Sequence, residues 1–295
     1  MNEHEALVER VAAQVQTVVL VGGLDSGKST LSRALLEAAI AAGRTAAYLD
    51  ADVGQKCVGP PATVGLKLVR SAEDLHPDRL AQADALAFVG STTPQGHLLP
   101  TVTGVARLAG LAREQGTGLV VVDTSGLVSG IYGQLLKYHK VEMVAPDVVV
   151  GLQRGEELTP LLGVIQRFFH TEVVSLGVHP GVVPTTVEQR AERREHAMRA
   201  YFAGTLQRWR VKPTVFMPAL PPLFETSQLD RLIVGLSDGG GSYLGIGYLE
   251  HGHDGVLRLV SPVAEGPKAL RLGSVRLDEN FRAKRVDLRN LFGTE

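Results

Sequence analysis

Residues 17–29 read TVVLVGGLDSGKS, a short β-branched run that passes into a glycine-rich turn. A buried parallel strand has this composition, and the turn matches the phosphate-binding pattern G-x-x-x-x-G-K-[ST]. From Lys28 to Gly43, apolar residues recur at helical spacing, which predicts a helix directly after the turn. Because a strand precedes the motif and a helix follows it, the pattern predicts a phosphate-binding loop rather than a glycine-rich turn with an incidental lysine.

Each part of this loop has a chemical purpose. The glycines let backbone N–H groups point at a phosphate, and the N-terminus of the helix adds a partial positive charge. We expect Lys28 to reach the β- and γ-phosphates and Ser29 to bind Mg²⁺, so the expected ligand is a nucleoside triphosphate with Mg²⁺. The nucleotide-binding residues predicted here are Gly22, Gly23, Leu24, Asp25, Ser26, Gly27, Lys28, Ser29 and Thr30.

Beyond the loop, segments with strand patterns alternate with segments of helical periodicity. Further strands are expected at 46–50, 85–89, 119–123, 147–152 and 171–176. Helices are expected at 3–15, 98–114, 133–144 and 186–204. This alternation predicts an α/β fold of the P-loop NTPase class, with a doubly wound, mostly parallel sheet.

The sequence pattern changes after about residue 210. Short apolar runs at 232–236, 243–249 and 256–260 are separated by turns, which predicts a small antiparallel β appendage. We therefore expect a P-loop domain, including the helix at 186–204, over residues 1–210 and a small β-rich domain over 211–295.

The composition limits the compartment and the partners. The 295 residues include a single cysteine, Cys57, which excludes an internal disulfide framework. No apolar run reaches membrane-helix length and the N-terminal segment is polar, so we expect a cytoplasmic enzyme without a membrane partner. A net charge of −1, with 5% aromatic residues, argues by itself against a nucleic-acid partner.

Acidic residues follow two of the expected strands. Asp50 and Asp52 lie at the end of the strand at 46–50, and Asp123 ends the apolar strand at 119–123, as in a Walker-B strand. Open α/β sheets bind ligands at this edge, where a carboxylate can hold a metal or accept a proton from an attacking hydroxyl. A strand-terminal Asp can also cap a turn, and the residues alone leave that alternative open.

Five motifs occur in an order that is typical of one family. They are GLDSGKST at 23–30, DVGQ at 52–55 with GPPATVG at 59–65, FVGSTTPQGH at 88–97, DTSGLVSG at 123–130, and RAERR at 190–194 leading to RAYF at 199–202. The chain resembles the polynucleotide 5′-hydroxyl kinases related to the kinase subunit of the eukaryotic pre-mRNA cleavage complex and to the ribosomal-RNA-processing kinases. The resemblance implies transfer of the γ-phosphoryl group of ATP or GTP to the 5′-hydroxyl end of RNA or DNA.

The resemblance also implies roles for individual residues. Asp52 falls on the acid that activates the 5′-hydroxyl and helps to hold Mg²⁺, and Gln55 lies beside it. With Ser29 and Asp123, these residues make the expected metal site. A clasp that grips the P-loop lysine and the phosphates falls on Thr93, Pro94, Gln95 and Gly96. The expected catalytic residues are Lys28, Asp52 and two arginines of a lid that closes over the triphosphate, Arg190 and Arg194.

The nucleobase and the substrate base are less well defined by the sequence. Gln153 follows the strand at 147–152, where P-loop proteins often contact the nucleobase, and we expect such a contact here. Leu127 stands where eukaryotic members carry a Trp that stacks on a substrate base, and His97 replaces a usual Asn at the end of the clasp. Only 16 residues precede Thr17, so the family's N-terminal β domain is expected to be absent. The choice between RNA and DNA stays open.

The charge is not evenly spread along the chain. Segment 187–212 carries seven Lys and Arg against three Glu, an excess of +4 that suits either the lid or a solvated helix face. If the segment is the lid, only a few phosphates near the 5′ end are gripped, and substrate binding should depend modestly on salt.

Other features have ordinary explanations. His251, His253 and Asp254 fit a turn better than a metal site, and Trp209 fits the core or an interface better than base stacking. Two alternative functions remain: a nucleotide-binding scaffold or assembly factor without transfer activity, and a kinase for a small nucleoside or metabolite. The oligomeric state also stays open.

Overall fold

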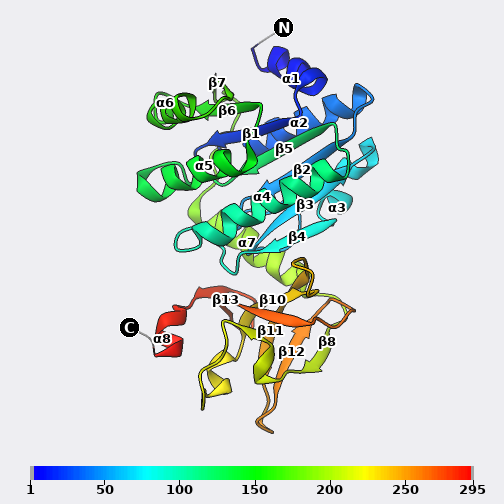
Figure 1. The fold of residues 1–295 in the computed structure, drawn as a ribbon, viewed down its shortest axis with the longest axis vertical. Coiled ribbons are helices and arrows are strands. Elements are labelled where there is room, and N and C mark those ends of the chain that lie inside the picture. The colour runs from blue at the N-terminus through cyan, green and yellow to red at the C-terminus, as the bar shows by residue number, and fades with distance from the viewer. Residues whose placement is uncertain (1–2, 294–295) are drawn as a thin grey trace.

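A seven-stranded sheet forms the centre of the N-terminal part of the chain in the computed structural model, which describes residues 3–293 (Figure 1). The strand order is β4-β3-β2-β5-β1-β6-β7, in which β2, β5, β1, β6 and β7 run parallel and β3 is antiparallel to both of its neighbours. The strands are β1 (Thr17–Gly22), β2 (Ala46–Ala51), β3 (Thr63–Val69), β4 (Ala85–Phe88), β5 (Leu119–Thr124), β6 (Val148–Gln153) and β7 (Glu172–Gly177).

All the strands expected in this part of the chain are confirmed, but β3 was not predicted. Its segment follows a glycine- and proline-rich loop and contains Gly65 and Lys67, which obscure the alternation of a strand. A Cβ at Gly65 would lie 2.3 Å from the carbonyl oxygen of Val58, so the returning loop requires a glycine inside this strand. The strand is stabilised by pairing with β2 and β4 rather than by its own propensity.

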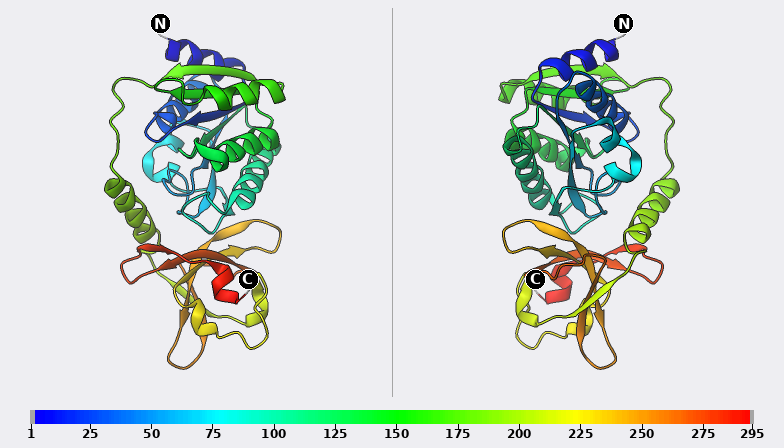
Figure 2. Two further views of the ribbon diagram at one scale, coloured as in Figure 1. Left: turned by 90° about the vertical axis from the view of Figure 1, so that its left-hand side faces the viewer. Right: turned by 90° about the vertical axis from the view of Figure 1, so that its right-hand side faces the viewer.

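Helices cover both faces of this sheet, so the doubly wound α/β arrangement is confirmed (Figures 1 and 2). Apolar residues of α4, α5 and α6 share one core cluster with the strands, and those of α1 and α2 share another. Helix α6 is the one large helix that the sequence pattern did not predict. No helix among residues 3–293 is long and apolar enough to cross a membrane. The helices are α1 (Glu3–Gln14), α2 (Lys28–Ala41), α3 (Pro77–Leu80), α4 (Leu98–Glu114), α5 (Gly130–Val144), α6 (Thr159–Phe168), α7 (Val187–Tyr201) and α8 (Leu288–Phe292).

A second seven-stranded sheet follows α7 and is mostly antiparallel (Figure 2). Its order is β14-β13-β10-β11-β12-β8, and β9 pairs in parallel with β13. Its first strand, β8, lies on the N-terminal side of the boundary expected after residue 210, and the division into two domains stays a prediction. The strands are β8 (Gln207–Arg210), β9 (Phe216–Met217), β10 (Leu232–Ser237), β11 (Tyr243–His251), β12 (Leu257–Ser261), β13 (Ala269–Leu277) and β14 (Ala283–Arg285).

The C-terminal sheet packs against the edge of the first sheet at β4. Phe88 of β4 is 1% exposed and belongs to a core cluster with Ile233 and Val275 of the C-terminal sheet. A Cβ at Gly235 would lie 2.4 Å from the Phe88 ring, so this close approach requires a glycine. The packing places the C-terminal sheet beside the loop that follows β4.

Candidate active site

The glycine-rich turn between β1 and α2 is built as a phosphate cradle. Gly27 caps α2 with φ of +85°, a left-handed conformation that favours glycine. Lys28 follows at the first helical position and is only 8% exposed. Its Nζ donates to the Gly23 carbonyl oxygen at 2.6 Å and to Ser26 Oγ at 3.1 Å. Burial lowers the pKa of Lys28, against the opposing effect of Asp123. The loop itself therefore holds the Lys28 ammonium in place.

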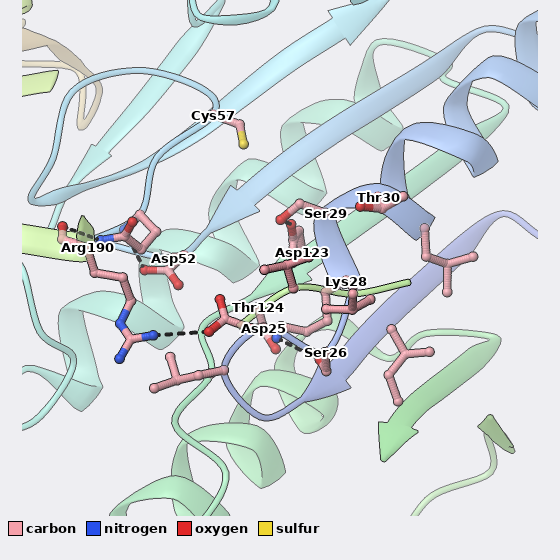
Figure 3. A pocket seen from close by; sticks show the side chains of 18 of the residues that line it. Asp25, Ser26, Lys28, Ser29, Thr30, Asp52, Cys57, Asp123, Thr124 and Arg190 are labelled. Atoms are coloured by element: carbon pink, nitrogen blue, oxygen red, sulfur yellow. Dashed lines mark hydrogen bonds and ion pairs between the residues drawn. The ribbon is translucent and has the colours of Figure 1, made fainter. Parts of the chain in front are cut away.

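This loop forms the floor of a cavity of about 1260 Å³ (Figure 3). Such a volume exceeds that of ordinary small-molecule pockets, so it has room for a triphosphate and a second substrate. The cavity brings together the P-loop, the ends of β2 and β5, helix α7 and helix α1. Residues expected in the site that line it are Leu24, Asp25, Ser26, Gly27, Lys28, Ser29, Thr30, Asp52, Gln55, Asp123 and Arg190.

Asp123, at the end of β5, lies directly beneath the first turn of α2. Its Oδ2 accepts hydrogen bonds from Ser29 Oγ at 2.6 Å and from the Tyr48 hydroxyl at 2.9 Å. A hydroxyl and a carboxylate in contact suit Mg²⁺, which takes oxygen ligands from one or two carboxylates and completes its shell with substrate phosphates. Tyr48, buried in β2, was missed by sequence reasoning, although strand alternation places it on the same side as Asp50.

The two acids after β2 have different environments. Asp50 is buried, accepts from the N–H groups of Cys57 at 2.6 Å and Val58 at 2.9 Å, and pairs with Lys56 at 3.1 Å. These contacts make Asp50 the residue that shapes the loop, as the turn-capping alternative predicts. Asp52 Oδ1 accepts from the N–H groups of Gly54 at 2.8 Å and Gln55 at 3.0 Å. The Asp52 carboxylate faces the cavity, across from Lys28 and Asp123 (Figure 3).

Helix α7 closes one side of the cavity and is fastened to the P-loop. Arg190 Nη1 contacts Asp25 Oδ2 at 3.1 Å, and the N–H of Thr185 donates to the same oxygen at 2.9 Å. Gln55 Nε2 donates to the carbonyl oxygen of Arg190 at 3.0 Å. Gln55 therefore ties the Asp52 loop to the helix, and only its Oε1 is left for a metal.

The second predicted lid arginine lies elsewhere in this conformation. Arg194 is not among the residues that line the cavity between 3 and 293, and its Cδ packs near Gly54. Arg193 and His196 line the cavity instead. The resemblance implied Arg194 as the second lid arginine and not Arg193, which lies three residues after Arg190 on the same helix.

The expected clasp lies beside the Asp52 loop and not at Lys28. Thr93, Pro94, Gln95 and Gly96 are absent from the cavity lining within the described part of the chain. A Cβ at Gly54 would lie 2.7 Å from the carbonyl oxygen of Thr92, so the two loops touch at a glycine. At the other end of the segment, His97 Nε2 lies 2.9 Å from Ser274 Oγ of β13. The grip on Lys28 stays a prediction.

Gln153, the residue expected to contact the nucleobase, does not lie at the far end of the cavity. Gln153 Nε2 donates to Ser175 Oγ at 2.7 Å and its Oε1 accepts from the N–H of Leu158 at 3.1 Å. The side chain therefore joins β6 to β7 and does not line the cavity. Its neighbour Arg154 contacts the P-loop at the carbonyl oxygen of Leu24.

Helix α1 and the loop after β7 form that end of the cavity instead. His4 and Val8 come from α1, and His179 begins the stretch of the loop that reaches Val183. The ring centroids of His4 and His179 lie 6.5 Å apart, edge to face. Arg10 Nη1 lies 2.7 Å from Glu172 Oε2 of β7. The sequence predicted α1 as an amphipathic helix, but no motif indicates that such a helix reaches a ligand site.

The remaining candidates take structural positions. Trp209 in β8 packs against the core of the C-terminal sheet. Asp254 pairs with Arg258 and accepts from the N–H of Val256, as the turn explanation predicts. No group of three or more His, Cys, Asp or Glu suited to a metal occurs among the described residues. Any Mg²⁺ at the cavity would therefore need oxygen atoms from a nucleotide as well as from the protein.

Comparison with known proteins gives the family. A family model described as the P-loop of mRNA cleavage and polyadenylation factor CLP1 matches residues 22–204. The chain belongs to this family. The resemblance drawn from the five motifs is confirmed, and the matched range includes the P-loop, the Asp52 loop, the expected clasp and α7.

Two archaeal relatives of this CLP1-family chain illustrate its coverage. The polyribonucleotide 5′-hydroxyl-kinase of Pyrococcus horikoshii is 35% identical over 193 residues, which cover 64% of this chain and 50% of the relative. The polyribonucleotide 5′-hydroxyl-kinase of Thermococcus kodakarensis is 28% identical over 331 residues, which cover 92% of each chain. The chain thus spans half the length of one relative and most of the other.

A solved structure supports the fold. The structure of a wild-type Clp1p–Pcf11p complex matches with a TM-score of 0.71 at 16% identity, covering 92% of this chain and 77% of that one. The match extends beyond the P-loop region and includes the C-terminal sheet, because 92% of the chain cannot be covered without it.

The buried carboxyl of Asp123 predicts a pH effect on stability. Burial raises the pKa of Asp123 to about 6, against the opposing effects of Lys28 and Ser29. Since the folded state then holds this proton more tightly than the unfolded chain, Asp123 makes the ligand-free protein lose stability as the pH rises from about 4 to about 6. Asp123→Asn should remove that loss, making the variant more stable relative to the natural protein by up to about 3 kcal/mol at pH 7.

Urea unfolding in a chelating buffer at several pH values between 4 and 7 measures this effect. The difference in unfolding free energy between the two proteins should grow across that range. A difference that stays constant with pH would contradict the raised pKa.

Proposed function

We propose that this chain is a Mg²⁺-dependent polyribonucleotide 5′-hydroxyl kinase that uses ATP or GTP. The observation that carries the proposal is the Asp52 carboxylate, which faces the same cavity as the P-loop and is oriented by two backbone N–H groups. A carboxylate in that place can accept the proton of a hydroxyl that attacks the terminal phosphate. The names of the archaeal relatives support RNA as the acceptor.

The reaction needs little covalent chemistry from the protein. The 5′-hydroxyl oxygen forms a bond to the γ-phosphorus, the bond from that phosphorus to the β–γ bridging oxygen breaks, and ADP or GDP leaves. The hydroxyl proton passes to Asp52. Lys28 and the loop N–H groups hold the triphosphate, and Arg190 offsets the charge on the transferring group. Mg²⁺, held by Ser29 and Asp123, would supply further charge neutralisation at the phosphates.

We place the nucleobase at the end of the cavity between α1 and the loop after β7. Val8, Leu31 and Ala34 give this end an apolar wall, and the loop around Gly181 offers backbone groups for polar contacts. A base flanked by an apolar wall and a few backbone groups is the usual composition of a cofactor site. This location supports neither ATP nor GTP over the other.

A panel of acceptors tests the proposal. Purified protein is incubated with Mg²⁺ and γ-labelled ATP or GTP, together with RNA and DNA oligonucleotides that carry a 5′-hydroxyl, and with free nucleosides. Label on the RNA 5′ end is expected, and an oligonucleotide with a 5′-phosphate serves as the control. Bound nucleotide without transfer to any acceptor would refute the kinase and favour the scaffold alternative, whereas transfer to free nucleosides alone would favour a small-molecule kinase.

The lid arginine predicts a second effect. Arg190→Met removes the guanidinium beside Asp25 and should lower kcat by about 1000-fold, the scale found for arginines that stabilise phosphoryl transfer. Arg199→Met is the matched control, because Arg199 lies on the same helix but donates to the carbonyl oxygen of Asn280, in the turn between β13 and β14. Steady-state kinetics on the RNA acceptor measure both variants. Equal kcat values for the two variants would remove Arg190 from the reaction.

A further inference from the structure

The C-terminal sheet is hydrogen-bonded to the loop that carries the expected clasp. The N–H of Ser274 in β13 donates to the carbonyl oxygen of Gly90 at 2.7 Å, and Ser274 Oγ lies 2.9 Å from His97 Nε2. A Cβ at Gly273 would lie 3.0 Å from the Gly90 carbonyl oxygen, so the backbones approach as closely as a glycine allows. The side chains of this sheet that face the loop are therefore held in place beside it.

Two of those side chains are arginines without acidic partners. The Arg285 guanidinium lies 3.2 Å from the place that a Cβ would take at Gly96, and Arg271 Nη1 donates to the carbonyl oxygen of Phe88 at 3.2 Å. Neither arginine forms an ion pair with any residue between 3 and 293. Arg285 pairs with Val275 across β13 and β14, and Val275 packs with Phe88, so this face of the sheet turns toward the loop.

The positive charge affects the residue between the two arginines. Burial lowers the pKa of His97, and the charges of Arg285 and Arg271 lower it further. At neutral pH His97 therefore adds no positive charge, and the positive charge beside the loop comes from Arg271, which is held by the Phe88 carbonyl oxygen, and from Arg285, which is exposed. Guanidinium groups without acidic partners are suited to bind phosphate oxygens.

The arginine pair continues from the candidate active site. The Asp52 loop touches the Gly90–His97 loop where Gly54 meets the carbonyl oxygen of Thr92, and Arg285 lies at Gly96, four residues further along. A single strand whose 5′-hydroxyl lies at Asp52 carries its first phosphates on the 3′ side, away from the triphosphate. The Gly90–His97 loop thus lies next to the Asp52 loop, and the C-terminal sheet packs on its other side.

We propose that Arg271 and Arg285 bind backbone phosphates of the acceptor strand that lie beyond the first phosphodiester on the 3′ side of the nucleotide that is phosphorylated. This inference rests on the proposed function and extends its binding site from the cavity onto the C-terminal sheet. The ligand is the phosphodiester backbone of a single strand, and the contact carries no base specificity. It also explains how a chain with a net charge of −1 holds a polyanion, since the cations are concentrated where the strand passes.

A matched pair of variants on one strand tests the inference. Lys284 precedes Arg285 in β14, is exposed, and lies opposite Arg276, so its side chain is on the other face of the sheet. Arg285→Gln and Lys284→Gln remove the same charge from adjacent positions. Binding of a 12-nucleotide 5′-hydroxyl RNA, labelled at its 3′ end, is followed by fluorescence anisotropy without triphosphate, at several salt concentrations.

Arg285→Gln is expected to weaken binding of the 12-mer about tenfold, as loss of one charge-assisted hydrogen bond would. The slope of log K against log salt should become shallower by about 0.7 for each phosphate that the variant no longer binds. Lys284→Gln should leave both quantities unchanged. Phosphorylation of a 5′-hydroxyl dinucleotide, which carries no phosphate far enough along the strand, should be the same in both variants and the natural protein.

Three results would overturn the inference. In the first, Arg285→Gln binds the 12-mer as tightly as Lys284→Gln does. Arg285 would then protect the sheet edge from pairing or bind an acidic protein partner. Arg285→Gln could lower dinucleotide phosphorylation and the thermal midpoint together, which would make Arg285 a stabilising contact of the loop. The natural protein could bind a 12-mer no more tightly than a dinucleotide. Failure of the proposed function would give a different result. The acceptor panel would then show no phosphoryl transfer, whereas the anisotropy experiment measures RNA binding without any transfer.

Discussion

Lys28→Ala is expected to lower the rate of phosphoryl transfer by about 1000-fold or more, because positioning and charge stabilisation supply most of the catalysis in this reaction. The Lys28 ammonium is buried against the P-loop and held by the Gly23 carbonyl oxygen and Ser26 Oγ. Arg154 contacts the outer side of the loop, at Leu24. The fold should survive, because burial lowers the pKa of Lys28, so the charged ammonium carries a desolvation cost that Ala removes.

The measurement is kcat/KM on the RNA acceptor, combined with the thermal midpoint of each variant. Arg33→Ala is the control, since Arg33 lies on the same helix but pairs with Glu37 and donates to the carbonyl oxygen of Leu75, away from the cavity. Activity that survives Lys28→Ala in a folded protein would show that the triphosphate is held elsewhere.

Asp52→Asn is expected to lower kcat by about 1000-fold, within the range found for loss of a general base. Asn keeps an oxygen that can accept from the N–H groups of Gly54 and Gln55, so the loop should stay in place. The amide cannot take the proton of the attacking hydroxyl. Single-turnover transfer with saturating nucleotide and RNA measures the chemical step without contributions from substrate binding.

Asp50→Asn is the informative comparison, because Asp50 lies two residues earlier and has the opposite role. Its carboxylate pairs with buried Lys56 and accepts from two loop N–H groups. Burial raises the pKa of Asp50, so loss of the charge itself is not costly, but Asn removes an acceptor and leaves Lys56 without its partner. We expect a loss of about 1–3 kcal/mol in the unfolding free energy. Asp52→Asn should lower activity at an unchanged thermal midpoint, and Asp50→Asn should lower the midpoint. The reverse pattern would exchange the two assignments.

Several parts of the fold could be predicted because their signal is local. Residues 18–21, directly before Gly22, are all apolar, as a strand buried on both faces requires, and the glycines and Lys28 follow at fixed spacing. Strand β3 and helix α6 were missed for different reasons. β3 contains a glycine required by packing against Val58, so tertiary contacts define this strand. Helix α6 was missed although it carries a local start signal, Pro160 in its first turn.

The residues of the candidate site also fall into two groups, those that the local sequence predicts and those that tertiary packing positions. Ser29, Asp123 and Asp52 meet because each follows a strand or turn that ends at one edge of a parallel sheet, which order along the chain is enough to predict. The clasp segment is absent from the cavity lining among the described residues, and the cavity end that we assign to the nucleobase is lined by α1 rather than by Gln153. These positions depend on how loops from separate segments pack together. Residue spacing within one segment cannot predict such packing.

The sequence by itself determined the phosphate cradle, the acidic residues opposite it and the family of the chain, because these depend on residue types at short, fixed spacings. Only the tertiary structure decided which of Asp50 and Asp52 faces the cavity, which arginine of α7 enters it, and where the C-terminal sheet lies. Each of those outcomes depends on hydrogen bonds and close contacts between residues far apart in the chain. Burial of Asp50 beside Lys56, and the contact of β13 with Gly90, are examples that a linear pattern does not contain.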